Sequence, residues 1–262
     1  MIFDVPPAIV GHRGFGAGLA GGYRENSVES FLAAARRGVP WVELDARRSS
    51  DGELVLWHDP VSPDGLLIVT QTAAELAVAG IVLLADVLAV LPAGVGVNID
   101  VKTTIEDATD PPEQRTHALV AGALHDFQGT RSFLVSSFDA SVPTYLKDRS
   151  ALIGDVALGL ITEQQYPAAQ AISAAANLGL DAVCLHIGAL LHAPRESGRP
   201  EPGDLRISAR QVLGYAHAGR LEVMTWSPDP DEALLLAQAG VDAVCVNDIP
   251  GVQAALAAFR PE

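Results

Sequence analysis

Short apolar runs alternate along this chain with longer segments in which apolar residues recur at helical spacing. The apolar runs have the length and the Val and Ile content of buried strands, and they cover 8–12, 41–46, 96–102, 133–137, 156–161, 181–187, 221–226 and 242–248. Helical patterns lie between them, at 26–38, 85–91, 112–127, 139–148, 164–178, 208–218 and 230–239, with a last helix ending near 259. An Asp-Gly turn inside 49–59 leads into one further extended run.

The alternation of strands and helices predicts a parallel sheet. About eight strand–helix units in 262 residues fit a closed (β/α)₈ barrel, a TIM barrel, forming a single domain over 1–262. The similarity of "LGLDAVCLHI" to "AGVDAVCVND" supports a repeated unit. An open, doubly wound sheet is the alternative, but "GHRGFGAG" lacks the G-x-G-x-x-G pattern of its dinucleotide-binding members.

Composition limits the class of partner. A formal net charge of −15 would repel nucleic acids and anionic membrane surfaces. Cys184 and Cys245 lie inside apolar runs, which predicts buried free thiols and no disulfide. The first residues lack the pattern of a secretory signal, and Asp86 and Pro92 interrupt the most apolar window, 76–99. We therefore expect a cytoplasmic protein without a stable membrane anchor.

Polar residues of several kinds follow the predicted strands at the ends where a barrel carries its active site. Glu43 and Asp45 share one face of a strand, as do Asp100 and Lys102, because side chains two apart point the same way. Three neighbouring carboxylates would repel one another, and one divalent cation, Mg²⁺ or Ca²⁺, would relieve that repulsion.

Positive and titratable groups accompany these carboxylates. Arg13 and Lys102 could hold a phosphate, and His12 and His58 could act on it as base and acid. Each feature alone has an ordinary structural explanation, such as a salt bridge, a capping pair or a turn before Pro60. Their joint occurrence at the ends of the first strands favours a catalytic site.

The stretch 11–60 carries His-Arg-Gly, then Glu-Asn, a helix with Phe and Ala, Glu-x-Asp, Asp-Gly and His-Asp. In this order the motifs resemble the glycerophosphodiester phosphodiesterase family, in its short bacterial form. Weaker similarity follows in "NIDVK", "VSSFD", "MTWSPD" and "GVDAVCVNDIP". The fold of that family is a TIM barrel, in agreement with the count of strand–helix units.

The resemblance implies a role for each matching residue. It implies metal ligation by Glu43, Asp45 and Asp100. It implies acid–base catalysis by His12 and His58, and substrate contacts from Arg13, Lys102 and Trp226. Glu25 and Asn26 would support this centre. The chain departs from the family pattern at several positions, namely Arg24 for proline, Asp100 for glutamate, "WSPDP" for Trp-Thr-Val-Asn, and Asn247-Asp248 for Thr-Asp.

The expected activity is metal-dependent hydrolysis of a small glycerophosphodiester to an alcohol and glycerol phosphate. In this scheme His12 takes a proton from the nucleophile and His58 gives one to the leaving alcohol, with the reverse assignment left open. The alternatives are a lysophospholipase-D-like enzyme and an inactive barrel that binds a phosphorylated ligand. The segment 186–207, rich in Pro, Gly and charge, is expected to be either a partial lid over the substrate or a passive surface excursion.

Overall fold

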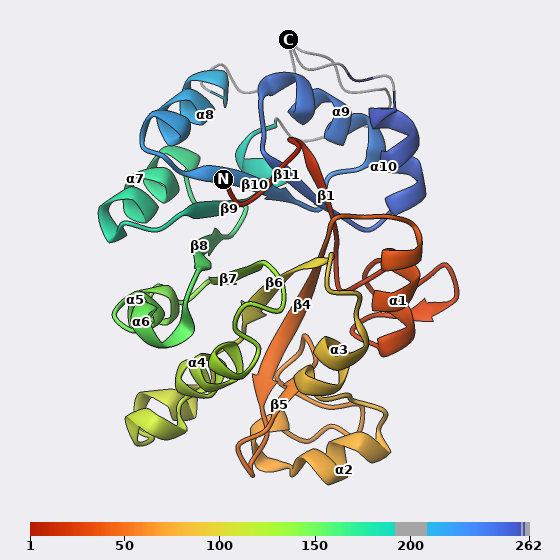
Figure 1. Cartoon of the computed structure of the whole chain (residues 1–262), viewed down its shortest axis with the longest axis vertical. Coiled ribbons are helices and arrows are strands. Elements are labelled where there is room, and N and C mark those ends of the chain that lie inside the picture. The colour runs from red at the N-terminus through yellow and green to blue at the C-terminus, as the bar shows by residue number, and fades with distance from the viewer. Residues whose placement is uncertain (192–208, 258, 260–262) are drawn as a thin grey trace.

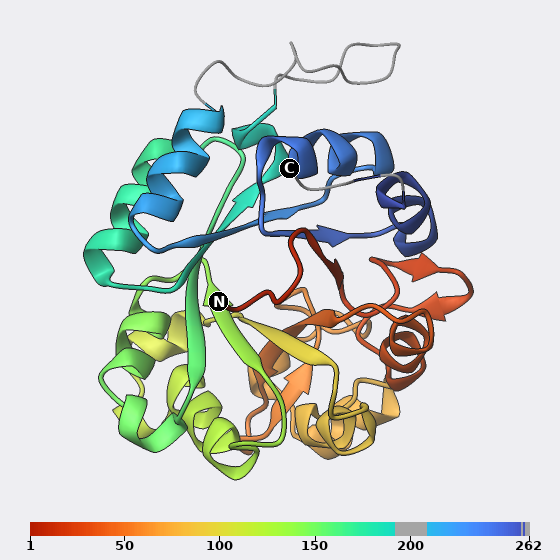
Figure 2. The same ribbon diagram turned by 45° about the horizontal axis from the view of Figure 1, so that its top comes forward.

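The computed structural model describes residues 1–191, 209–257 and 259. Eight parallel strands form a closed ring (Figures 1 and 2), in the spatial order β1 (Ala8–Gly11), β11 (Ala243–Val246), β10 (Glu222–Trp226), β9 (Ala182–His186), β8 (Val156–Thr162), β7 (Phe133–Ser137), β6 (Gly96–Val101) and β4 (Trp41–Arg48). The ring closes because β1 also pairs with β4, with Val10 opposite Trp41. The predicted barrel is confirmed, and this closure rules out the open sheet.

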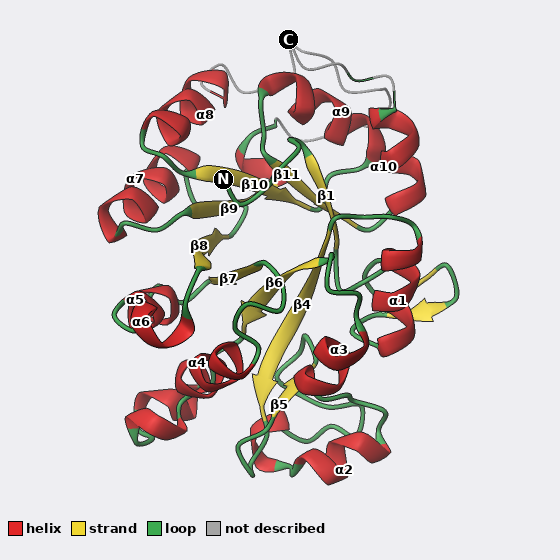
Figure 3. Cartoon of the chain, viewed as in Figure 1, coloured by secondary structure: helices red, strands yellow, loops and turns green. Residues whose placement is uncertain are grey.

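Helices surround the ring on its outside (Figure 3). In chain order they are α1 (Val28–Arg36), α3 (Leu84–Val90), α4 (Thr116–Asp126), α5 (Ser141–Lys147), α6 (Ser150–Ile153), α7 (Ala168–Leu178), α8 (Ala209–Ala218), α9 (Pro230–Ala239) and α10 (Ile249–Leu256). Helix α1 begins after Ser27, whose hydroxyl accepts from the Ser30 N–H at 3.2 Å. The helix predicted over 112–127 is divided into a 3₁₀ turn, η3 (Pro112–Gln114), and α4, because Arg115 between them is extended.

Two regions add structure beyond the eight-stranded ring, and the first contains the extended run predicted after the Asp-Gly turn. Strand β4 continues to Arg48 and pairs antiparallel with β5 (Leu54–Leu56), which lies outside the ring and leads to η1 (Ile68–Thr70) and α2 (Ala73–Val78). The glycine-rich loop after β1 contains a small hairpin of β2 (Leu19–Ala20) and β3 (Tyr23–Arg24). Two short 3₁₀ turns, η2 (Ile105–Ala108) and η4 (Ile187–Ala189), complete the described elements.

Apolar side chains fill the amino-terminal end of the barrel. Phe3 is fully buried there and packs edge-on against Trp41, with ring centroids 5.3 Å apart. The backbone N–H groups of Ile2 and Phe3 donate to the Glu222 carboxylate, which fixes this segment across the end of the ring. The polar inward-facing residues therefore lie toward the opposite, carboxyl-terminal end.

Candidate active site

A cavity of about 340 Å³ lies among the carboxyl-terminal ends of the strands. The predicted catalytic, metal-binding and substrate-binding residues all line it, namely His12, Arg13, Glu43, Asp45, His58, Asp100, Lys102 and Trp226. A larger hollow of about 570 Å³ is lined by residues such as Ile2 and Glu222 and includes none of them. Because active sites of this fold occupy the carboxyl-terminal face, the smaller cavity is the candidate active site.

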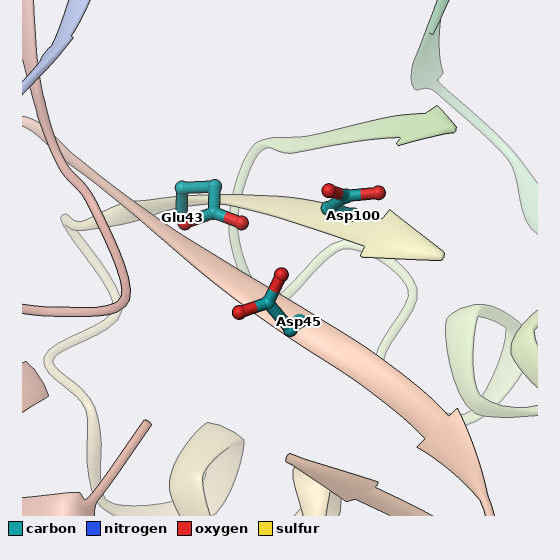
Figure 4. Close-up of side chains that lie close together, drawn as sticks. All are labelled: Glu43, Asp45 and Asp100. Atoms are coloured by element: carbon teal, nitrogen blue, oxygen red, sulfur yellow. The ribbon is translucent and has the colours of Figure 1, made fainter. Parts of the chain in front are cut away.

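The three predicted metal ligands converge inside this cavity. Asp45 of β4 lies directly opposite Asp100 of β6 in the strand register, and Glu43 is two residues before Asp45 on the same face. One carboxylate oxygen from each residue lies within 4.8 Å of the others, and all three side chains are buried. Figure 4 shows the three carboxyl groups over these two adjacent strands.

Burial and mutual repulsion act unequally on the three carboxyl groups. Burial raises the pKa of Glu43 well above its ordinary value, and the charges of Asp45 and Asp100 act in the same direction. Burial also raises the pKa of Asp100 to about 6, although Lys102 acts in the opposite direction. The pKa of Asp45 is lowered, because Lys102 and Arg13 together outweigh the effect of its burial.

These residues fit a hard divalent cation. Such an ion prefers carboxylate oxygens, and the cluster offers three. The Oδ1 atom of Asp100 is buried and has no hydrogen-bond partner among the described residues, while its Oδ2 atom is held by Lys102. A buried carboxylate oxygen without a partner costs free energy of folding. A cation bound beside it would offset that cost.

The two basic side chains are bound to the carboxylates. Lys102 Nζ lies 3.1 Å from Asp45 Oδ1 and also contacts Asp100 Oδ2. Arg13 Nε lies 3.1 Å from Asp45 Oδ2, and Arg13 Nη1 lies 3.0 Å from Glu25 Oε2. Asn26 Nδ2 donates to Asp45 Oδ2 at 2.8 Å. The pair named as supporting residues therefore lies behind the carboxylates, where it orients Arg13 and Asp45.

A tight turn after β1 sets the position of His12 and Arg13. The N–H of Gly14 donates to the Gly11 carbonyl at 3.2 Å, and Arg13 and Gly14 adopt φ values of 51° and 96°. A Cβ atom at position 14 would lie 2.9 Å from the Ser30 backbone, so only glycine fits this close approach to α1. The turn aims the Arg13 N–H at Glu43 Oε2, 2.9 Å away.

The hydrogen bonds of Asn247 determine which ring nitrogen of His12 carries a proton. Asn247 Oδ1 accepts from the Ala17 N–H at 3.0 Å and lies 2.7 Å from His12 Nδ1. Since Oδ1 can only accept, His12 Nδ1 donates to it, and Nε2 is the atom left without a proton in the neutral ring. Burial lowers the pKa of His12 to about 4, and the charge of Arg13 acts in the same direction.

His58 has a charged partner in place of an amide. Its Nδ1 atom lies 2.7 Å from Asp59 Oδ1, and the ring is more exposed than that of His12, at 40% against 14%. Arg47 Nε donates to the His58 carbonyl at 2.9 Å, which anchors this loop to the end of β4. The two histidines thus come from separate segments and reach the same cavity.

Several cavity residues were not among the predicted site residues. They are Asn98, Phe138, Ile161, Glu163, Cys184, Met224 and Cys245. Asn98 had a readable signal, since it precedes Asp100 by two positions on the same strand face. The predicted burial of both thiols is confirmed. Of the segment 186–207, expected as a lid or a surface excursion, the part 192–207 lies outside the described residues.

A closed barrel with buried carboxylates, two cationic side chains and two histidines at its carboxyl-terminal end defines a site suited to phosphoester chemistry. A model of the glycerophosphoryl diester phosphodiesterase family matches residues 12–250, and the chain belongs to that family. The family consists of phosphoric diester hydrolases, and the resemblance seen in 11–60 is thereby confirmed.

Solved structures of other proteins share this fold. A Galdieria sulphuraria protein assigned to the glycerophosphodiester phosphodiesterases superposes with a TM-score of 0.77 at 21% identity, over 97% of this chain and 98% of the other. An Oleispira antarctica phosphodiesterase, solved with the product sn-glycerol-3-phosphate, superposes with a TM-score of 0.70 at 21% identity, over 96% and 97% of the two chains.

Curated relatives are similar over a shorter stretch. A glycerophosphocholine phosphodiesterase of Candida albicans is 42% identical over 59 residues, which are 21% of this chain and only 5% of that much longer protein. Within the described residues, no helix has the length and hydropathy to cross a bilayer.

Proposed function

We propose that this protein hydrolyses a small glycerophosphodiester to sn-glycerol 3-phosphate and an alcohol, with a single divalent cation, Mg²⁺ or Ca²⁺, as cofactor. The observation that carries the proposal is the convergence of Glu43, Asp45 and Asp100 in one cavity with two histidines. The product found in the Oleispira antarctica phosphodiesterase supports this substrate class. We further propose that residues 1–262 form one domain that acts in the cytoplasm, which rests on the composition and the count of strand–helix units.

A cation held by the three carboxylates would supply positive charge to the phosphate oxygens and lower the pKa of a water molecule. The chain's own residues bind and orient the diester. Lys102 and Arg13 border the cavity beside Asp45 and bring two further positive charges to a phosphate placed there. Trp226 offers an indole N–H that is buried without a partner on the cavity wall. Together these groups fix the phosphorus for displacement of the alcohol.

The two imidazole rings have different hydrogen-bond partners. His12 Nδ1 donates to a neutral amide oxygen, and the lowered pKa leaves Nε2 free to accept a proton from water. A phosphate anion bound nearby would raise that pKa toward the working range. The carboxylate of Asp59 accepts from His58 Nδ1 and so orients this ring, from which we propose that the leaving alcohol receives its proton. We therefore assign the base to His12 and the acid to His58.

The first test measures release of sn-glycerol 3-phosphate from glycerophosphocholine after EDTA treatment and after addition of Mg²⁺ or Ca²⁺. EDTA should abolish turnover and one of the two cations should restore it. Asp45→Asn should lose roughly 100-fold or more in kcat/KM, because a cation of this kind contributes several kcal/mol to transition-state stabilisation. Asp64→Asn, which removes the same charge from an exposed turn, is the matched control.

Three results would contradict the proposal. Full activity in metal-free buffer would exclude the cation. Hydrolysis of lysophosphatidylcholine without hydrolysis of glycerophosphocholine would assign the protein to the lysophospholipase-D-like alternative, and absence of both activities with retained phosphate binding would indicate the inactive barrel.

A further inference from the structure

Asn98 carries a hydrogen-bond donor that the protein leaves unused. The residue lies on β6, two positions before Asp100 and directly opposite Glu43 in the register with β4. Its side chain is 1% exposed, yet its Nδ2 atom has no hydrogen-bond partner in the part of the chain that the structure describes. Since a buried amide without partners costs free energy, such an atom in a folded protein calls for a compensating contact.

The orientation of this amide is fixed by a neighbour. Ser136 Oγ lies 2.8 Å from Asn98 Oδ1, and Ser136 pairs with Asp100 across β6 and β7. The serine hydroxyl donates to the amide oxygen, so the amide nitrogen lies on the other side of the group. Asn98 is also one of the residues that line the catalytic cavity.

Two other polar atoms that line the cavity also have no hydrogen-bond partner among the described residues, and each suits a different part of a metal-bound phosphate ligand. Asp100 Oδ1 is an unpartnered acceptor and matches a cation, whereas Trp226 Nε1 and Asn98 Nδ2 are unpartnered donors and match ligand oxygens. Apolar side chains, including Ile161 and Met224, also line this cavity. A donor fixed in such a wall recognises an oxygen that enters the cavity from outside.

We infer that Asn98 is a substrate-binding residue whose Nδ2 group donates a hydrogen bond to an oxygen of the phosphoglycerol part of the substrate. This inference rests on the proposed function, because it assumes that a glycerophosphodiester occupies the cavity. The acceptor is a phosphate oxygen or a glycerol hydroxyl, and both are hydrogen-bond acceptors of the same geometry. In either case Asn98 increases the affinity for the substrate and orients it. Asn98 lies on β6, the strand that also carries Asp100.

The test compares Asn98→Leu, which is similar in size and cannot donate, with the unmodified protein. Calorimetry with Ca²⁺ present measures the Kd of sn-glycerol 3-phosphate, inorganic phosphate and glycerol. We expect Asn98→Leu to weaken sn-glycerol 3-phosphate binding roughly 10- to 100-fold, as for loss of a hydrogen bond to a charged or strongly polar oxygen. An equal loss for inorganic phosphate assigns the phosphate oxygen, and a loss confined to sn-glycerol 3-phosphate assigns the hydroxyl.

A melting temperature without ligand separates binding from a purely structural role. Asn98→Leu removes an unsatisfied amide nitrogen but also the acceptor of the Ser136 hydroxyl, so its melting temperature should stay unchanged or fall modestly. Thr225→Val is the matched control, because its hydroxyl is also buried without a partner but does not line the cavity. It should leave every Kd unchanged. Asn98→Asp, which keeps the shape and replaces the donor by a negative charge, should weaken binding at least as much as Asn98→Leu.

Unchanged affinity for sn-glycerol 3-phosphate in both Asn98 variants, with the Kd of Ca²⁺ also unchanged, would overturn the inference. A fall in melting temperature with no loss of affinity would do the same and would assign a structural role. Failure of the unmodified protein to bind sn-glycerol 3-phosphate would instead refute the proposed function, so the two failures are distinguishable.

Discussion

Lys102→Met removes the positive charge that lies between two buried carboxylates. Lys102 Nζ is 3.1 Å from Asp45 Oδ1 and also contacts Asp100 Oδ2, and the lysine side chain is 12% exposed. Removing one partner of a buried ion pair costs about 3–5 kcal/mol. Asp100 limits this cost, because its pKa of about 6 rises further without Lys102 and the carboxyl group takes up a proton.

We therefore expect a loss of about 2–3 kcal/mol in the free energy of unfolding of the metal-free protein. At roughly 2–4 °C per kcal/mol for a chain of this size, the melting temperature should fall by roughly 5–10 °C. A divalent cation replaces the missing charge, so it should bind the variant more tightly and raise its melting temperature by more than it raises that of the unmodified protein.

Differential scanning calorimetry in EDTA, and then in saturating Mg²⁺ or Ca²⁺, measures both effects. Lys147→Met is the matched control, because Lys147 Nζ donates to the Leu178 carbonyl at the protein surface and not to a buried carboxylate. Lys102→Arg keeps the charge and should keep most of the stability. A metal-free melting temperature equal to that of the control, or an equal response to the cation in variant and unmodified protein, would refute the electrostatic reasoning.

Two further predictions concern proton transfer and proton competition. His58→Ala should lose roughly 10²–10⁴-fold in rate on glycerophosphocholine but far less on a nitrophenyl phosphodiester, whose leaving group needs no proton, while His12→Ala should lose heavily on both. If His58→Ala loses the same factor in rate on both substrates, His58 is not the general acid. Cation binding requires ionised carboxylates, so affinity should rise with pH through the pKa of Asp100, about 6, and be roughly tenfold weaker at about pH 5 than at about pH 7. Calorimetry in buffers of different ionisation enthalpy should detect proton release near pH 5, with Glu43 adding to it, and pH-independent affinity would exclude this competition.

The barrel and the carboxylate cluster were predictable from the sequence because both depend on local periodicity. Alternating strand and helix patterns indicated eight parallel strands, and residues two apart on a strand necessarily share a face. That rule placed Glu43 with Asp45, and parallel neighbours then brought Asp100 beside them. The motif order in 11–60 also indicated the family, because these motifs lie in one continuous stretch and can be read without the tertiary structure.

Contacts between distant segments were decided only by the tertiary structure. His12 and Asn247 are 235 positions apart and meet because β1 pairs with β11 when the ring closes. Likewise the sequence placed Asn98 on a strand, but the hydrogen bond that orients its amide comes from Ser136 on the next strand, and its Nδ2 atom finds no partner among the described residues. Periodicity determines the direction in which a side chain points. The packing of the closed barrel determines which partner that side chain meets, and therefore which proton or ligand it holds.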